Sequence, residues 1–473
     1  MNVKKTLLIV FSLLFAFYCG YGLFSVRAEK YFRGTLENGD YAVYGVVESK
    51  TDNGSFFHIV LSNVIIDKNE QYGKLVAYLP ATFSEKVRVA DEVLLEGSVR
   101  QIEEFSPYSA DENIRFEMTV KGITVVGRSN NPFLRFRGVM EETLYRHTDA
   151  TAAALMIAVL TGNTDGVSQG LLQNMRYGGI AHVFAVSGLH VSALYGFCLL
   201  LMQKTKLRKL PKHASFLLTA LVLTSYGAFC GFSASIIRAT VICLLLLGTR
   251  QLGIVSDITE NAGTSAIVVL LRSPFALFTV GFQLSFAAFL GIVWLSRPIT
   301  NACYRLLEKF KKKEAAEGVE RPLSVGARML RGAISFLSVS LAAQIFTAPI
   351  LLSAFEYLSG AALLLNCLFV PVLSASFSLL LLAALLSCVL PFLAKVFLLF
   401  PSIVWNVLTL LFEAVDFSKF CITGITVGGG ATVLYFLALM FLTDKWNVSA
   451  VKKKVFSIIL FLLFAVGMYA LNA

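Results

Sequence analysis

Long apolar runs follow one another along most of this chain, separated by short polar segments. Several runs reach about 20 residues, the length of a helix that spans a bilayer. The pattern predicts a polytopic α-helical membrane protein, and 56% hydrophobic against 15% charged residues agrees with this class. The expected spans are residues 6–24, 181–203, 214–232, 234–252, a region at 262–295 broken at Arg272-Ser273-Pro274, 333–355, 360–387, 389–412, 424–443 and 455–472. The broken region is expected to form two short spans or re-entrant halves.

Residues 30–130 follow a different pattern, in which apolar and polar positions alternate over short runs. Alternation with a period of two predicts strands, and turn residues such as Asp52-Asn53-Gly54 separate them. Five short strands in about 100 residues suit a small all-β barrel of the OB type. The expected strands are Tyr41–Val47, Phe56–Val64, Lys74–Leu79, Glu92–Val99 and Phe116–Val126. Barrels of this type often bind single-stranded nucleic acid on aromatic side chains, but this segment is acidic and we interpret its aromatic residues as core.

These patterns divide the chain into four parts. Residues 1–29 are predicted to form an uncleaved signal-anchor helix with a cytoplasmic N-terminus, because Lys4 and Lys5 precede the first apolar run. Residues 30–130 then form an extracytoplasmic OB-like domain. Residues 131–180 are an amphipathic or re-entrant linker that contains the helical run Leu144–Leu160. Residues 181–473 form a multi-pass transmembrane domain.

The net charge of +11 is explained better by membrane topology than by a ligand. Residues 30–130 contain 11 basic and 15 acidic residues, a net charge of −4, so the remainder carries +15. Much of that excess lies in short segments between spans, at 204–212, 309–313 and 445–454, as is typical of cytoplasmic loops. The eight cysteines lie in or beside apolar runs, where thiols act as small packing groups.

Polar residues interrupt several apolar runs, and at membrane depth they are costly unless they face other helices or water. The longest interruption is Gly178–His190. Arg238 lies about one turn inside a span, and it either extends to the interface or faces an anionic substrate or a carboxylate. Pro-broken segments with neighbouring amides favour a water-filled path between helices. The candidate path residues are His182, Ser187, Gly188, His190, Ser233, Ser235, Arg238, Gln283, Ser285, Gln344 and Asn366.

Catalytic and metal-binding interpretations of the same residues are less well supported. An intramembrane serine hydrolase would pair Ser187 with His190, but the sequence has no GxSxG motif. His182 and His190 are eight residues apart, and no HxHxDH or HExxH motif is present. We therefore expect no metal site and no cofactor, and the chain has no GxxxxGK[ST] P-loop. The hydrolase and a transporter of a lipid or small anionic solute are the alternatives to a channel.

Five motifs resemble those of the ComEC competence protein family. The family pattern G-x-x-H-[LI]-x-A-[IV]-S-G-L-H stands here as Gly179–His190, with Val183 where Leu or Ile is usual. The other elements follow in family order: G-x-x-x-S-x-x-R-A at Gly231–Ala239, G-F-Q-L-S-F at Gly281–Phe286, T-x-P at Thr347–Pro349 and N-x-x-x-x-P at Asn366–Pro371. The OB-like segment before them also resembles the family.

The resemblance implies a channel in the bacterial cytoplasmic (inner) membrane that passes single-stranded DNA during natural transformation. It implies DNA and membrane lipids as partners, together with a DNA receptor and a cytoplasmic helicase or ATPase, and it leaves a homo-oligomer open. Many family members end in a metallo-β-lactamase-like nuclease domain with an HxHxDH motif, which this sequence does not contain. We therefore expect a channel without enzymatic activity and a separate nuclease as a partner, or else a truncated or repurposed homologue.

Overall fold

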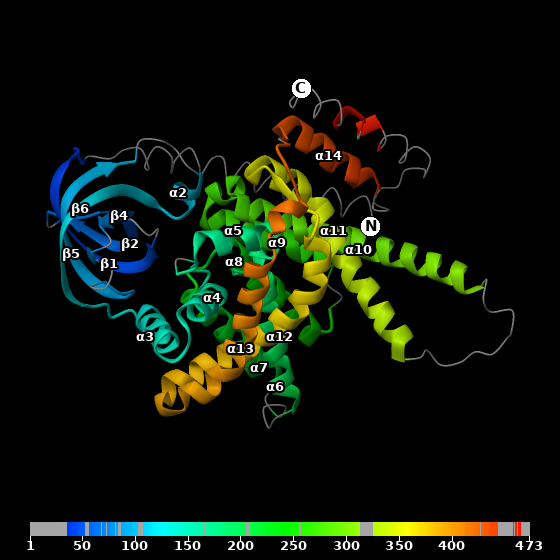
Figure 1. Cartoon of the computed structure of the whole chain (residues 1–473), viewed down its shortest axis with the longest axis horizontal. Coiled ribbons are helices and arrows are strands. Elements are labelled where there is room, and N and C mark those ends of the chain that lie inside the picture. Colours follow the sequence, from blue (N-terminus) through cyan, green and yellow to red (C-terminus); the bar gives the residue numbers. More distant parts are fainter. Residues whose placement is uncertain are drawn as a thin grey trace.

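The computed structural model describes residues 36–464 with gaps, the longest at 313–324 and 443–456. Its described part consists of an N-terminal β-barrel and a larger body of helices (Figure 1). The predicted fold class is thereby confirmed. The expected anchor at 1–29 and most of the expected span at 455–472 lie outside the described residues.

The barrel is formed by β1 (Gly39–Asp52), β2 (Phe56–Ile66), β4 (Lys74–Pro80), β5 (Asp91–Gln101) and β6 (Ile114–Arg128), with a short β3 (Asn69–Glu70) beside β2. The strands close in the order β1-β2-β4-β6-β5-β1, and β4–β6 is the parallel pair among these described strands. This is the Greek-key connectivity of an OB barrel. Strict alternation of buried and accessible residues in β5 turns its apolar positions inward.

Aromatic residues of the barrel lie both inside and outside it. Phe57 and Phe116 belong to its buried apolar core, as the sequence predicted. Tyr78 is instead 42% exposed on β4, beside His58 of β2 at a ring-centroid distance of 5.9 Å. The outer face of β2 and β4 therefore presents one aromatic pair to the surroundings.

Short helices lie where the barrel and the helical body meet, with α2 inside the barrel's β5–β6 connection and the others after β6. They are α2 (Pro107–Asp111), α3 (Pro132–His147), α4 (Ala150–Thr161), α5 (Gln169–Tyr177) and the 3₁₀ turn η2 (Ala181–Val183). Every residue of α4 from Ala152 to Thr161 is buried, so α4 is enclosed by other helices rather than amphipathic at a surface. The interfacial interpretation of Leu144–Leu160 is therefore wrong for α4, because this apolar helix packs against α3, α12 and α13.

The remaining helices are α6 (Gly188–Lys204), α7 (Lys212–Phe229), α8 (Ala234–Leu252), α9 (Ile258–Arg272), α10 (Val280–Lys312), α11 (Val325–Phe355), α12 (Ala362–Val389), α13 (Ala394–Ala414) and α14 (Gly429–Leu442). Within the described residues, five helical segments are long and apolar enough to cross a membrane: Ala234–Leu252, Val280–Leu307, Met329–Phe355, Ala362–Val389 and Pro391–Ala414. The break predicted at Arg272-Ser273-Pro274 is present, since α9 ends at Arg272 and the 3₁₀ turn η4 (Pro274–Phe278) precedes α10. The helix expected to begin at residue 181 instead begins at Gly188, and at 17 residues it is not among these five segments.

Candidate functional site

Arg238 is the most unusual polar residue in the helical body. It lies in the second turn of α8 and is 8% exposed. Its Nη1 donates a hydrogen bond to the backbone oxygen of Ser285 on α10 at 2.6 Å. The rings of Phe286 and Phe289 lie 5.5 Å from its Cζ, at a distance suited to cation–π attraction. The guanidinium is therefore held inside the protein, between α8 and α10, and does not extend to the interface.

The buried Arg238 guanidinium has at least one N–H group that is not used in a hydrogen bond with a described residue. Its Nε makes no hydrogen bond with any described residue. The ion pairs found between described residues do not include Arg238 either. A buried cation normally has an anionic partner, because desolvation of an unpaired charge is costly. The site is thus chemically suited to an anionic group that approaches the guanidinium.

Several of the predicted path residues surround Arg238. Ser235 lies one turn earlier on α8, and its hydroxyl donates to the hydroxyl of Ser285 at 3.0 Å. Gly188 at the start of α6 lies on another side, since a Cβ placed on it would be 3.0 Å from Nη2 of Arg238. Residues from α6, α8 and α10 therefore meet at one point, although about 100 positions separate the first from the last.

Ser187 and His190 shape the start of α6. The Ser187 hydroxyl accepts a hydrogen bond from the Leu189 N–H at 3.2 Å, the geometry of a helix N-cap. The Ser187 N–H donates to Nδ1 of His190 at 3.0 Å, whereas the two side chains are 3.4 Å apart. The His190 ring is buried and packs edge-on against Phe377 of α12 at 4.6 Å. These contacts cap the first turn of α6 and hold the His190 side chain in place.

The other predicted residues are not joined to Arg238 by any hydrogen bond between described residues. His182 is exposed, and its Nδ1 lies 3.1 Å from the Gly179 oxygen. Gln283 is exposed too, and its side chain donates to the Leu277 oxygen of η4 at 3.2 Å. Ser233 precedes α8 without making a side-chain cap. Gln344 lies on α11 and Asn366 on α12, where the Asn366 Oδ1 is buried without a hydrogen-bond partner among the described residues.

Metal binding receives no positive support. Within the described residues, no group of three or more His, Cys, Asp or Glu side chains is arranged to hold a metal ion.

Asn174 on α5 is a structural residue that the sequence analysis missed. Its Nδ2 donates to the Val415 oxygen at 2.7 Å and also to the Phe412 oxygen, and its Oδ1 accepts from the Phe417 N–H at 2.8 Å. One amide thus satisfies backbone groups that the end of α13 leaves without helical partners. A lone Asn in a short helix carries no sequence signal for such a contact with residues some 240 positions away.

The Gly178-Gly179 pair is the close-packing part of the predicted motif. A Cβ on Gly179 would lie 2.2 Å from the Ala362 Cβ, and the φ of Gly179 is +76°. A Cβ on Gly178 would lie 2.6 Å from the Phe412 ring. Only glycine combines this backbone conformation with so close an approach. The pair therefore seats the segment before α6 against α12 and α13.

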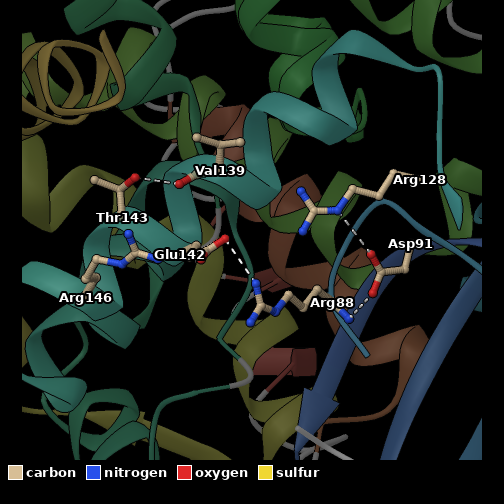
Figure 2. A network of polar contacts seen from close by, with 7 residues as sticks. All are labelled: Arg88, Asp91, Arg128, Val139, Glu142, Thr143 and Arg146. Atoms are coloured by element: carbon tan, nitrogen blue, oxygen red, sulfur yellow. Dashed lines mark hydrogen bonds and ion pairs between the residues drawn. The ribbon is translucent and has the colours of Figure 1, made fainter. Parts of the chain in front are cut away.

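Charged residues connect the barrel to the helical body on α3 (Figure 2). Glu142 of α3 pairs with Arg88 of the β4–β5 connection at 3.2 Å and with Arg146 one turn later at 2.9 Å. Asp91 accepts from the Arg88 N–H at 2.8 Å, which fixes the turn that presents Arg88. A cavity of about 560 Å³ lies at this junction, lined by residues of the barrel, α3 and α4.

Comparison with known proteins places these features in a family context. Residues 159–448 match the sequence profile of the family described as "Competence protein". ComE operon protein 3 of Bacillus subtilis (strain 168) is 29% identical over 224 residues, which make up 46% of this chain but only 24% of that protein. Among solved structures, the aspartyl tRNA synthetase from Entamoeba histolytica aligns over 42% of each chain at 14% identity. The TM-score of this alignment is 0.18.

Proposed function

Because this chain belongs to the competence protein family, we propose that it takes part in DNA uptake and passes single-stranded DNA across the membrane. The matched segment, residues 159–448, contains the entire Arg238 site. The described part of the helical body includes five segments able to cross a membrane, as a multi-pass membrane protein requires.

The observation that carries this proposal is the buried Arg238 guanidinium with an unused donor. A DNA strand presents one negative phosphate per nucleotide, and arginine binds phosphate through directed, charge-assisted hydrogen bonds. A passage must bind each group strongly enough to admit it and weakly enough to release it. A single cation, already partly satisfied by the Ser285 oxygen, fits this requirement better than a cluster of cations would.

The rest of the proposal concerns the protein's surroundings. We place the chain in the bacterial cytoplasmic membrane, with a cytoplasmic N-terminus and the barrel outside. The partners are the DNA strand, membrane lipids, a DNA receptor, a cytoplasmic helicase or ATPase that supplies the driving force, and a separate nuclease. The chain itself acts as a channel without catalysis.

Two alternatives make different use of the same residues. A transporter of a small anionic solute or a lipid would also bind an anionic group at Arg238. A serine hydrolase would need the Ser187 hydroxyl to donate to His190, but the two side chains are 3.4 Å apart and Nδ1 of His190 already accepts from the Ser187 backbone N–H at 3.0 Å. The occupied Nδ1 of His190 therefore favours a transport role over hydrolysis.

The test replaces Arg238 with Gln in a competent host that depends on this protein, and measures entry of labelled DNA into a nuclease-resistant pool. Loss of a charged hydrogen bond of about 1.5–3 kcal/mol to the moving strand predicts a ten- to hundredfold slower uptake. Arg250→Gln, on the same helix but exposed at its other end, is the matched control. Unchanged uptake in Arg238→Gln, with normal protein levels in the membrane, would contradict the proposal.

A further inference from the structure

We propose that the α12–α13 hairpin does not cross the membrane, although both helices are long enough to do so. Instead it lies embedded in the half of the membrane that faces the barrel, with its turn in contact with lipid acyl chains. This inference rests on contacts between helices and is independent of the proposed transport role.

Three contacts define the barrel side of the helical body. Ala110 of α2, in the barrel's β5–β6 connection, packs on Phe275 of η4. Arg272 at the end of α9 donates to the Phe232 oxygen in the α7–α8 turn. Phe136 of α3 lies 5.9 Å from Phe229 at the end of α7. The ends of α7 and α9 and the starts of α8 and α10 are therefore on the barrel side.

The first end of α12 is also on the barrel side. Helices α10 and α11 pack closely, since a Cβ on Gly291 would lie 2.5 Å from the Ala342 oxygen. Val280 at the start of α10 and Ile350 near the end of α11 pack in one apolar cluster, so the two helices run antiparallel. Because α10 starts on the barrel side, α11 ends there, and α12 starts only seven residues after Phe355.

The other end of α12 returns to the same side. Helix α12 packs against α3, and Cys388 near its end lies close to Thr143 of α3. Thr143 directly follows Glu142, which pairs with the barrel residue Arg88 (Figure 2). Figure 1 shows α3 between the barrel and the turn of the α12–α13 hairpin. Halfway along α12, Phe377 lies 6.0 Å from Tyr226, one turn before the barrel-side end of α7.

Helix length makes this arrangement incompatible with a crossing. An α-helix of 28 residues is about 42 Å long, more than the roughly 30 Å of a hydrocarbon core. A crossing helix would carry its second end to the far side, where Lys212 of α7 donates to the Gln251 oxygen of α8. Instead, α12 contacts barrel-side residues at its start, middle and end. Its axis therefore runs parallel to the membrane plane.

The turn of the hairpin has the surface expected of a lipid-embedded segment. Val389, Phe392 and Val396 are 73%, 79% and 66% exposed, and Lys395 is the one charged residue in 389–396. In water this surface would be unfavourable, whereas acyl chains solvate it. A long lysine side chain at such a depth can reach the headgroups.

The backbone of the turn meets the strict requirement of a lipid environment, in which polar groups need internal partners. The Leu390 N–H donates to the Leu386 oxygen at 2.7 Å, and the Leu393 N–H donates to the Leu390 oxygen at 3.0 Å. The Ala394 N–H donates to the Pro391 oxygen, and proline has no N–H of its own.

Basic-residue patterns cannot detect this arrangement. If two consecutive crossings are removed, the segments before and after them stay on the same sides of the membrane. The basic segments on either side of the hairpin therefore keep their predicted sides in both arrangements.

The decisive experiment measures the side from which the turn is accessible in the full-length chain. In a background with all eight cysteines replaced by serine or alanine, Lys395→Cys is treated with a membrane-impermeant maleimide in spheroplasts and in inverted vesicles. Lys121→Cys on the barrel and Lys209→Cys after α6 report the two sides. We expect labelling from the side of Lys121→Cys, or only after detergent is added. Labelling from the side of Lys209→Cys overturns the proposal.

A second measurement identifies what covers the turn. A nitroxide attached to Phe392→Cys in lipid vesicles is tested for collision with oxygen and with a water-soluble nickel chelate. High oxygen and low nickel accessibility shows contact with lipid, as proposed. High nickel accessibility shows water, and low accessibility to both shows a protein contact such as a second copy; either result overturns the lipid assignment. Tyr78→Cys, which is exposed on the barrel, provides the water reference.

Discussion

Gly188 at the start of α6 lies directly against the guanidinium of Arg238 on α8. A Cβ at residue 188 would come within 3.0 Å of Nη2 and 3.6 Å of the Ala239 Cβ. The guanidinium has little room to withdraw, because Phe286 and Phe289 flank it and Ser285 accepts its hydrogen bond. The position of the first residue of α6 therefore determines how the Arg238 guanidinium is oriented.

This coupling predicts the effect of Gly188→Ala. The added methyl should displace the end of the arginine side chain by a few tenths of an ångström, with little loss of stability but with a clear reduction in DNA uptake. Gly196→Ala on the same helix is the matched control, since a Cβ there has no neighbour within 4 Å. Uptake assays at equal membrane levels compare the two variants. Equal uptake by both would show that the guanidinium position has no functional importance.

Ser187 is predicted to act as a helix cap and not as a nucleophile. Ser187→Ala removes the acceptor for the Leu189 N–H and should cost about 1 kcal/mol of stability. Ser187→Asn restores a cap but has no hydroxyl, so uptake and thermal stability should recover toward the original values. A hydrolase would be inactive with either residue. Failure of Asn to recover what Ala loses would contradict the cap assignment.

Asn174 is predicted to be a major stabilising contact between α5 and the end of α13. Asn174→Ala removes three hydrogen bonds to backbone groups in partly buried surroundings, at a net cost of about 1 kcal/mol each. Thermal unfolding of the purified chain in detergent should show the loss. Gln169→Ala, exposed on the same helix, should leave the unfolding temperature nearly unchanged. Similar behaviour of the two variants would rule out the capping role.

The barrel is predicted to lose stability as the pH falls. Burial lowers the pKa of His58, so the folded barrel favours the neutral imidazole. The contribution of His58 is complete above its unfolded pKa of about 6.5 and is lost as the pH falls through the lower folded value. The protection factors of the β2 amides, which are the exchange rates corrected for the intrinsic effect of pH, should therefore fall more between neutral and mildly acidic pH in the original chain than in His58→Gln. An identical pH response in His58→Gln would exclude this histidine as a cause.

Several features could be predicted because they depend on local patterns. Alternating residues define the strands of the barrel, and the break at Arg272-Ser273-Pro274 follows from proline's missing N–H. Arg238 was recognisable because a charge in an apolar run is costly wherever it is placed. Its neighbours Ser235 and Ser285 were predicted from the motifs, and the structure brings both to it.

Other features depend on contacts between distant segments. The apolar run within α4 is compatible with a surface helix, a re-entrant piece or a buried one, and its enclosure by α3, α12 and α13 excludes the surface position. Gln283 and Gln344 looked equivalent to Ser285 as path residues, yet no hydrogen bond among the described residues joins either of them to the Arg238 site. Which of these polar side chains lie next to Arg238 depends on how α8, α10 and α11 pack together.

The sequence alone determined the class of the protein, the position of the barrel and the family motifs, because hydrophobic burial and backbone hydrogen bonding act on local periodicity. Only the tertiary structure decided that Gly188, Ser235 and Ser285 meet at Arg238, and that α12 packs against α3 and α6. The physical reason is that an apolar helix has no preferred direction of its own in lipid. Its course is set by the helices that it packs against.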